Sequence, residues 1–117
     1  MSGICGWAGP PSPEGDATLD RMLDAIDYRG DTSARERAAG ATLGYRFWRG
    51  RPGKSPGIER DGARIAACAG TFAPAVPSPA RAVLARAAAG AGAWADADGA
   101  FAFAIFDEER EELVLGR

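Results

Sequence analysis

The last part of the sequence constrains the fold more than any other stretch. Residues 100–106 alternate small and large side chains, as expected for a strand that has one face covered. A charged turn over residues 107–111 leads into a second strand over residues 112–115, and residues 58–68 repeat this pattern around Asp61-Gly62. Hairpins pair their strands antiparallel, so we expect an α+β fold with antiparallel sheets rather than a Rossmann-type sheet.

Two helices are expected between the strands. Large apolar residues recur at i, i+3, i+4 and i+7 over residues 19–26, which predicts an amphipathic helix over residues 17–27 with Asp16 as its N-cap. Ser78-Pro79 is typical of an N-cap and a first helical residue, and it opens an alanine-rich segment that we expect to end at Gly90.

The rest of the chain is predicted to form strands and loops. Residues 4–8 and 41–48 are rich in β-forming residues and are expected to be strands. Gly30 suits a left-handed turn after the first helix. The charged run over residues 35–37 is expected to be a solvated loop, and residues 49–56, rich in glycine and proline, a second loop.

The composition indicates a globular protein and excludes several classes of function. The chain has 117 residues, 46% of them apolar, which fits one domain over residues 1–117. No run reaches the ~18 apolar residues of a membrane span and no signal peptide opens the chain, so we expect a cytoplasmic protein that binds no membrane. The 14 basic residues are scattered and the net charge is −2, which argues against a nucleic-acid partner. With two cysteines and no histidine, neither a metal site nor a cofactor is expected.

The absence of histidine also limits the candidate nucleophiles. Serine–histidine and cysteine–histidine sites are impossible, so Cys5 is either a small buried apolar residue or a nucleophile with another base. An N-terminal cysteine can use its own α-amino group, with a pKa near ~8, as that base. This chemistry requires a free amine on Cys5, and four residues precede it.

Several stretches, taken together, suggest a family. They are Cys5-Gly6-Trp7-Ala8-Gly9, Tyr28-Arg29-Gly30-Asp31, Leu43-Gly44-Tyr45-Arg46 and the final hairpin over residues 98–117. In this order they resemble the glutaminase domain of class II glutamine amidotransferases, and most closely the asparagine synthetase branch. That family opens with Met-Cys-Gly-Ile-Ala-Gly and uses the exposed cysteine to hydrolyse glutamine.

The resemblance implies a fold and a set of site residues. The family's fold is an αββα sandwich of the N-terminal-nucleophile type. The similarity implies that Cys5 is the nucleophile, that the Gly70 N–H stabilises the oxyanion, and that Arg46 holds the glutamine carboxylate, with Arg29 as a further substrate-binding residue. The family's domain continues beyond the position of Arg117, so the chain is either a fragment or a short form that completes its sheets in another way.

The chain also departs from the family's motifs. Ala69 stands where the family has the oxyanion-hole asparagine, and loss of one such donor costs on the order of 10²–10³ in rate. Pro79 replaces the aspartate that holds the substrate's amino group, and Arg81 adds a positive charge nearby. Tyr28 and Tyr45 replace histidines.

Two hypotheses follow from the resemblance. The first is a catalytically degenerate domain with a structural or partner-binding role, in the same chain as a synthetase domain or beside one. The second is a working glutaminase that acts on glutamine through Cys5 after removal of residues 1–4. Under either hypothesis we expect no disulfide between Cys5 and Cys68, because Cys68 and Ala69 point to opposite faces of a strand.

Overall fold

Two antiparallel sheets and two helices make up the computed structural model, which describes residues 2–50 and 57–117. The loop expected over residues 49–56 falls mostly outside the described residues. The first sheet has the order β1-β3-β2 and the second the order β4-β5-β6-β7. The strands are β1 (Gly3–Ala8), β2 (Thr32–Ala38), β3 (Ala41–Phe47), β4 (Ile58–Asp61), β5 (Arg64–Phe72), β6 (Gly99–Asp107) and β7 (Glu112–Gly116). The helices are α1 (Pro13–Ala25) and α2 (Pro79–Ala89), with the short 3₁₀ turns η1 (Asp27–Arg29) and η2 (Ala91–Trp94).

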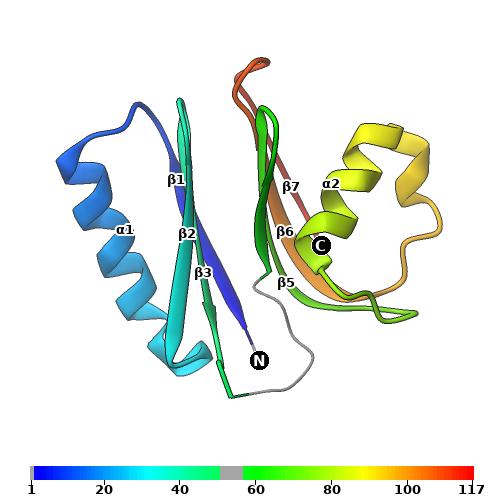
Figure 1. Ribbon diagram of the computed structural model, residues 1–117, viewed down its shortest axis with the longest axis horizontal. Coiled ribbons are helices and arrows are strands. Elements are labelled where there is room, and N and C mark those ends of the chain that lie inside the picture. Colours follow the sequence, from blue (N-terminus) through cyan, green and yellow to red (C-terminus); the bar gives the residue numbers. More distant parts are fainter. Residues whose placement is uncertain (1, 51–56) are drawn as a thin grey trace.

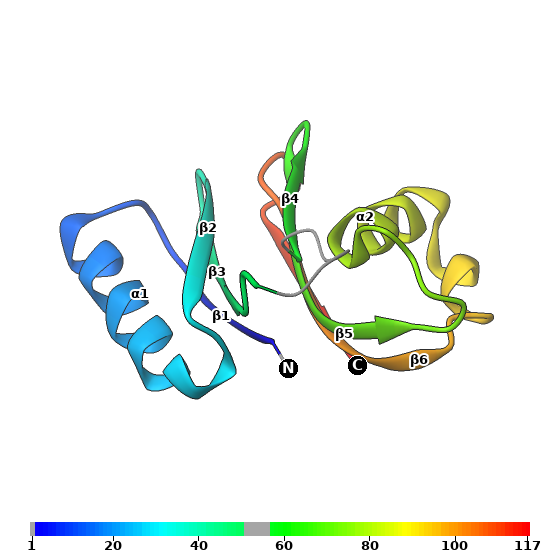
Figure 2. The same cartoon turned by 60° about the horizontal axis from the view of Figure 1, so that its bottom comes forward.

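The elements stack in four layers, in the order helix, sheet, sheet, helix (Figure 1). Helix α1 covers the outer face of the first sheet and α2 covers the outer face of the second, and a view turned by 60° keeps this order (Figure 2). Buried side chains from both sheets form the core between them, among them Leu43 and Tyr45 of β3 and Ile65 and Phe106 of the second sheet. The prediction of an α+β fold with antiparallel sheets and two helices is therefore confirmed.

Helix α1 begins earlier than the sequence pattern suggested. The true N-cap is Ser12, whose hydroxyl accepts a hydrogen bond from the Gly15 N–H at 3.0 Å, and Pro13 is the first helical residue. The expected start at Asp16 was wrong because the run of prolines and glycine looked like a loop, although Ser-Pro is a favourable helix start. The helix seats Leu19 and Leu23 on the first sheet, where both are almost fully buried.

The charged run over residues 35–37 is part of strand β2 and not a solvated loop. Its arginines lie on the face that α1 covers, where Arg35 pairs with Asp20 at 2.6 Å and Arg37 pairs with Asp16 at 2.7 Å. A strand with one covered face normally alternates apolar and polar residues. Strand β2 lacks this alternation, because the side chains that face α1 are arginines paired with carboxylates of the helix.

Gly30 does not form the left-handed turn that was expected. Its φ is 165°, which is extended backbone open to any residue. A Cβ at Gly30 would lie 2.2 Å from the carbonyl carbon and oxygen of Phe47, so glycine is needed there for a close approach of two backbone segments.

The second sheet agrees more closely with its sequence pattern. Helix α2 starts at Pro79 with Ser78 as its N-cap and ends before Gly90, as predicted. The hairpin turn between β4 and β5 is Gly62–Ala63, one residue later than expected, and β5 continues to Phe72. Cys68 faces α2, whereas Ala69 packs against the core between the sheets, which confirms that the two side chains point in opposite directions.

The sheets are tied together at one end of the sandwich by Glu108, in the turn between β6 and β7. Its carboxylate accepts a hydrogen bond from the Ala39 N–H at 3.0 Å, in the turn between β2 and β3, and lies 3.4 Å from Arg60. The start of β1 and the end of β5 lie at the other end of the sheets (Figure 1). The candidate site is therefore at the end that this contact does not close.

Candidate functional site

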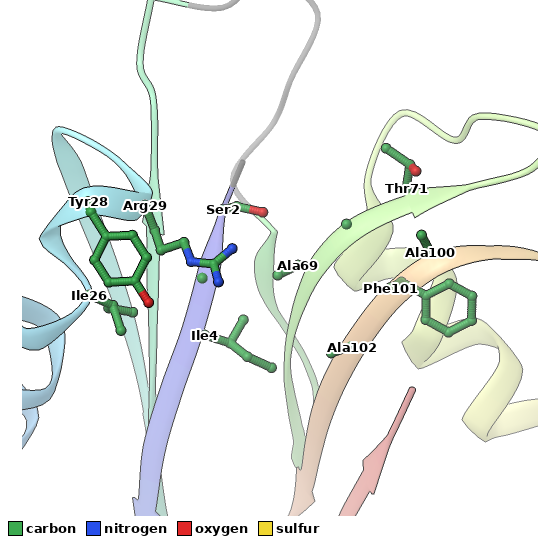
Figure 3. Close-up of a pocket in the computed structure, with 12 residues that line it drawn as sticks. Ser2, Ile4, Ile26, Tyr28, Arg29, Ala69, Thr71, Ala100, Phe101 and Ala102 are labelled. Carbon is green, nitrogen blue, oxygen red and sulfur yellow. The ribbon is translucent and has the colours of Figure 1, made fainter.

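A cavity of about 530 Å³ lies between the two sheets, at the start of β1. Its walls come from β1, from η1 and the residue before it, and from facing parts of β5 and β6 (Figure 3). The polar side chains in its lining are Ser2, Tyr28, Arg29 and Thr71. Two residues singled out in the sequence, Arg29 and Gly70, thus meet in one cavity although they are far apart along the chain.

Arg29 is the one charged residue among the twelve that line the cavity. Its guanidinium lies 5.1 Å from the centre of the Tyr28 ring and extends over β1 towards Ile4 and Ser2 (Figure 3). Within residues 2–50 and 57–117, no carboxylate forms an ion pair with Arg29.

Gly3 makes room for the Arg29 side chain. A Cβ at Gly3 would lie 3.0 Å from Cγ of Arg29 and 3.1 Å from Cδ1 of Ile26. Any larger residue at this position has to displace the stem that carries the guanidinium to the cavity.

Gly70 holds the opposite wall in a backbone conformation that other residues rarely adopt. Its φ is +112°, and a Cβ there would lie 2.1 Å from the carbonyl oxygen of Ala100. The neighbouring Ala69 lines the same cavity with a methyl group, and so offers no side-chain donor where the resembling family has an amide.

Cys5 is not among the residues that line this cavity. It pairs with Gly44 across β1 and β3, and a Cβ at Gly44 would lie 2.9 Å from the Cys5 sulfur and 3.1 Å from Cδ2 of Leu23. The thiol therefore packs between the first sheet and α1. Burial raises the pKa of the Cys5 thiol, against a smaller lowering by the positive charges of Arg35 and Arg46, so the thiol stays protonated near neutral pH.

Cys5 does contribute to a second cavity of about 240 Å³ at the edge of the sandwich between β1 and β7. Trp7, Leu113 and Leu115 also line it, and among its described lining residues there is neither an acid nor a base. Nothing in this lining supplies a proton acceptor for the thiol. Cys5 and Cys68 are both free.

Arg46 is also directed away from the larger cavity. Its guanidinium donates two hydrogen bonds to the Leu23 carbonyl oxygen, at 3.1 and 2.9 Å, and lies 3.6 Å from a carboxylate oxygen of Asp24. These contacts satisfy a carbonyl in the last turn of α1, an arrangement that stabilises helix ends. The structure places Arg46 as a support of α1, not beside Arg29 and Gly70.

Ser2 is a cavity residue that the sequence interpretation missed. Side chains alternate along a strand, so Ser2 and Ile4 share one face of β1 while Gly3, Cys5 and Trp7 share the other. Ser2 lies in the cavity lining, as do Ile4 and Ala69 (Figure 3). The period of two separates the two faces of the strand, but it does not show which face meets the second sheet.

Within the described ranges, no cluster of three or more histidine, cysteine or carboxylate side chains could hold a metal ion. In the same part of the chain, none of the helices has the length and apolar character needed to span a membrane. No model of a known protein family matches the sequence, and no curated protein was found to be similar to it.

Proposed function

We propose that this chain is a domain of the class II glutamine amidotransferase type, with the N-terminal-nucleophile αββα fold of the asparagine synthetase branch, that has lost glutamine hydrolysis. The order helix, sheet, sheet, helix supports this proposal, as does the meeting of Arg29 and Gly70 in one cavity. In this proposal the retained fold serves a structural or partner-binding role beside a synthetase domain.

The observation that carries the loss of catalysis is the position of the Cys5 thiol. It packs against α1 with a raised pKa, while the cavity that holds Arg29 and Gly70 lies around the start of β1. A nucleophilic thiol has to be ionised and within reach of the carbonyl that it attacks. In this arrangement the raised pKa keeps the Cys5 thiol protonated and Cys5 is not among the residues that line the cavity, and Ala69 provides no second oxyanion donor.

A partner-binding role is supported by strand β7. This edge strand exposes Leu113, Val114 and Leu115, the last with 70% of its surface accessible. Its outer edge has no strand partner among the described residues. A row of free backbone N–H and C=O groups is a template for pairing with another extended strand, so the occupant that we propose is a strand of the synthetase partner.

The loss of catalysis is tested by incubating the purified protein with glutamine and measuring the release of glutamate. We expect the wild type to be indistinguishable from Cys5→Ala and Ser2→Ala. Hydrolysis that disappears in Cys5→Ala would overturn the proposal and restore Cys5 as the nucleophile. Hydrolysis that disappears only in Ser2→Ala would overturn it in favour of a serine enzyme, and the intact mass then shows whether Ser2 carries a free amine.

A further inference from the structure

The charge of the larger cavity is unbalanced. Among the twelve described residues that line it, Arg29 is basic and none is acidic. Segment 51–56, which the structure does not describe, contains no aspartate or glutamate in its sequence. A half-buried guanidinium without a carboxylate partner favours an anionic ligand, because the ligand would replace water with a charge-assisted hydrogen bond.

The rest of the lining suits a small molecule with a single acidic end. Hydroxyl groups of Ser2, Tyr28 and Thr71 can donate further hydrogen bonds to an oxygen anion. The side chains of Ile4, Ala69 and Ala102 provide apolar wall for the remainder of the ligand. The volume, about 530 Å³, lies within the ~300–1,000 Å³ typical of small-molecule sites.

The same charges disfavour an α-amino acid. Its ammonium group is bound to the carbon next to the carboxylate, so docking the carboxylate on Arg29 brings the ammonium close to the guanidinium. No lining carboxylate compensates this like-charge contact, and burying an unpaired ammonium is costly.

We infer that this cavity binds a small carboxylate that has an apolar or amide tail and no α-amino group, with Arg29 as the ligand of the carboxylate. The inference deepens the proposed function and rests on it, because it concerns the same cavity. It differs from glutamine recognition, in which the substrate's ammonium also needs an anionic partner.

Matched ligand pairs test the inference. The monoamide of glutaric acid is glutamine without its α-amino group, and isocaproate is leucine without its α-amino group. We expect each deaminated ligand to bind the full chain at least about tenfold more tightly than its amino acid, the equivalent of one charge-assisted contact. Calorimetry gives the affinities, and amide chemical shifts of residues 2–4 and 69–71 locate the ligand.

Variants test the role of Arg29. Arg29→Gln is expected to weaken isocaproate binding by about tenfold or more, and Arg29→Lys by less, because a lysine keeps the charge but loses the two-pronged contact. Arg21→Gln is the matched control, since Arg21 is an exposed arginine of α1 that bonds Thr18 and lies outside the cavity lining. Far-UV circular dichroism verifies that each variant is folded.

The inference fails if either amino acid binds as tightly as its deaminated counterpart, if none of the four ligands binds, or if Arg29→Gln binds isocaproate like the wild type. If Arg29→Gln does not fold, the ligand pairs on the wild type decide. The binding measurements are separate from the assay of glutamate release. Glutamate release tests the loss of catalysis, and the binding preference tests the identity of the ligand.

Discussion

Alanine at Gly15 is expected to destabilise the protein, although alanine normally favours a helix. Gly15 lies in the first turn of α1 under the indole ring of Trp7, and a Cβ there would lie 1.8 Å from Cζ2 and 2.5 Å from Cη2 of that ring. Helix propensity alone would stabilise the variant by up to ~1 kcal/mol. Overpacking a fixed ring costs about 1–3 kcal/mol, so after this offset we expect a net loss of up to about 2 kcal/mol in the free energy of unfolding.

A double-mutant cycle isolates this contact. In a Trp7→Ala background the ring is absent, so Gly15→Ala should become neutral or stabilising by up to ~1 kcal/mol. Gly92→Ala is the control, because a Cβ at Gly92 meets nothing within 4 Å, and it should change stability by less than about 0.5 kcal/mol. Urea unfolding followed by far-UV circular dichroism measures all four variants against the wild type.

Equal effects of Gly15→Ala in the two backgrounds would refute the reasoning. Trp7 and Cys5 lie on the same face of β1, so the Trp7 ring beside Gly15 and the Cys5 thiol are both on the side of the first sheet that α1 covers. Failure of the cycle would therefore also count against the assignment of this face of β1, and of the Cys5 thiol with it, to the α1 side.

Three further outcomes are expected. Gly3→Val should push the Arg29 stem out of position and weaken isocaproate binding by about fivefold, the equivalent of ~1 kcal/mol for an off-rotamer side chain; calorimetry that shows unchanged affinity would contradict this. Burial raises the pKa of the Cys68 thiol to about 11 from 9.0, so the unfolded chain ionises first. Stability should therefore fall as pH rises from 9.0 towards about 11, by up to ~1.4 kcal/mol per unit, and urea unfolding should show a flatter pH profile for Cys68→Ala. Leu115→Lys should reduce self-association of the isolated chain at high concentration, because it places a charge on the exposed edge strand. If light scattering finds wild type and variant equally monomeric, β7 does not mediate association of this kind.

Local signals predicted part of this structure well. Helix α2 was predicted at both ends because the Ser78 hydroxyl caps its start by accepting a hydrogen bond from the Arg81 N–H, and Gly90 ends it; both effects act within a few residues. The final hairpin was predicted for a similar reason, since one covered face produces a period of two in the sequence. Strand β2 was missed because its pattern depends on carboxylates of α1, which are distant in sequence.

The candidate site was only partly predictable. Arg29 and Gly70 were named from motifs, and the structure brings them into one cavity. Arg46 was named in the same way, but its position on β3 directs it to the Leu23 carbonyl. Ser2 was overlooked, because alternation along β1 divides its residues between two faces without showing which face meets the second sheet.

The sequence by itself determined the antiparallel hairpins, the second helix and the absence of histidine-based chemistry. These depend on local hydrogen bonding, backbone preferences and composition, which are independent of the rest of the fold. Only the tertiary structure decided that the Cys5 thiol faces α1 and that Arg29 lies unpaired in a cavity beside Gly70. Both result from how two sheets and a helix pack. The sequence pattern of a strand does not show which of its two faces meets the helix, and contacts with residues distant in sequence, such as Trp7 on Gly15, decide it.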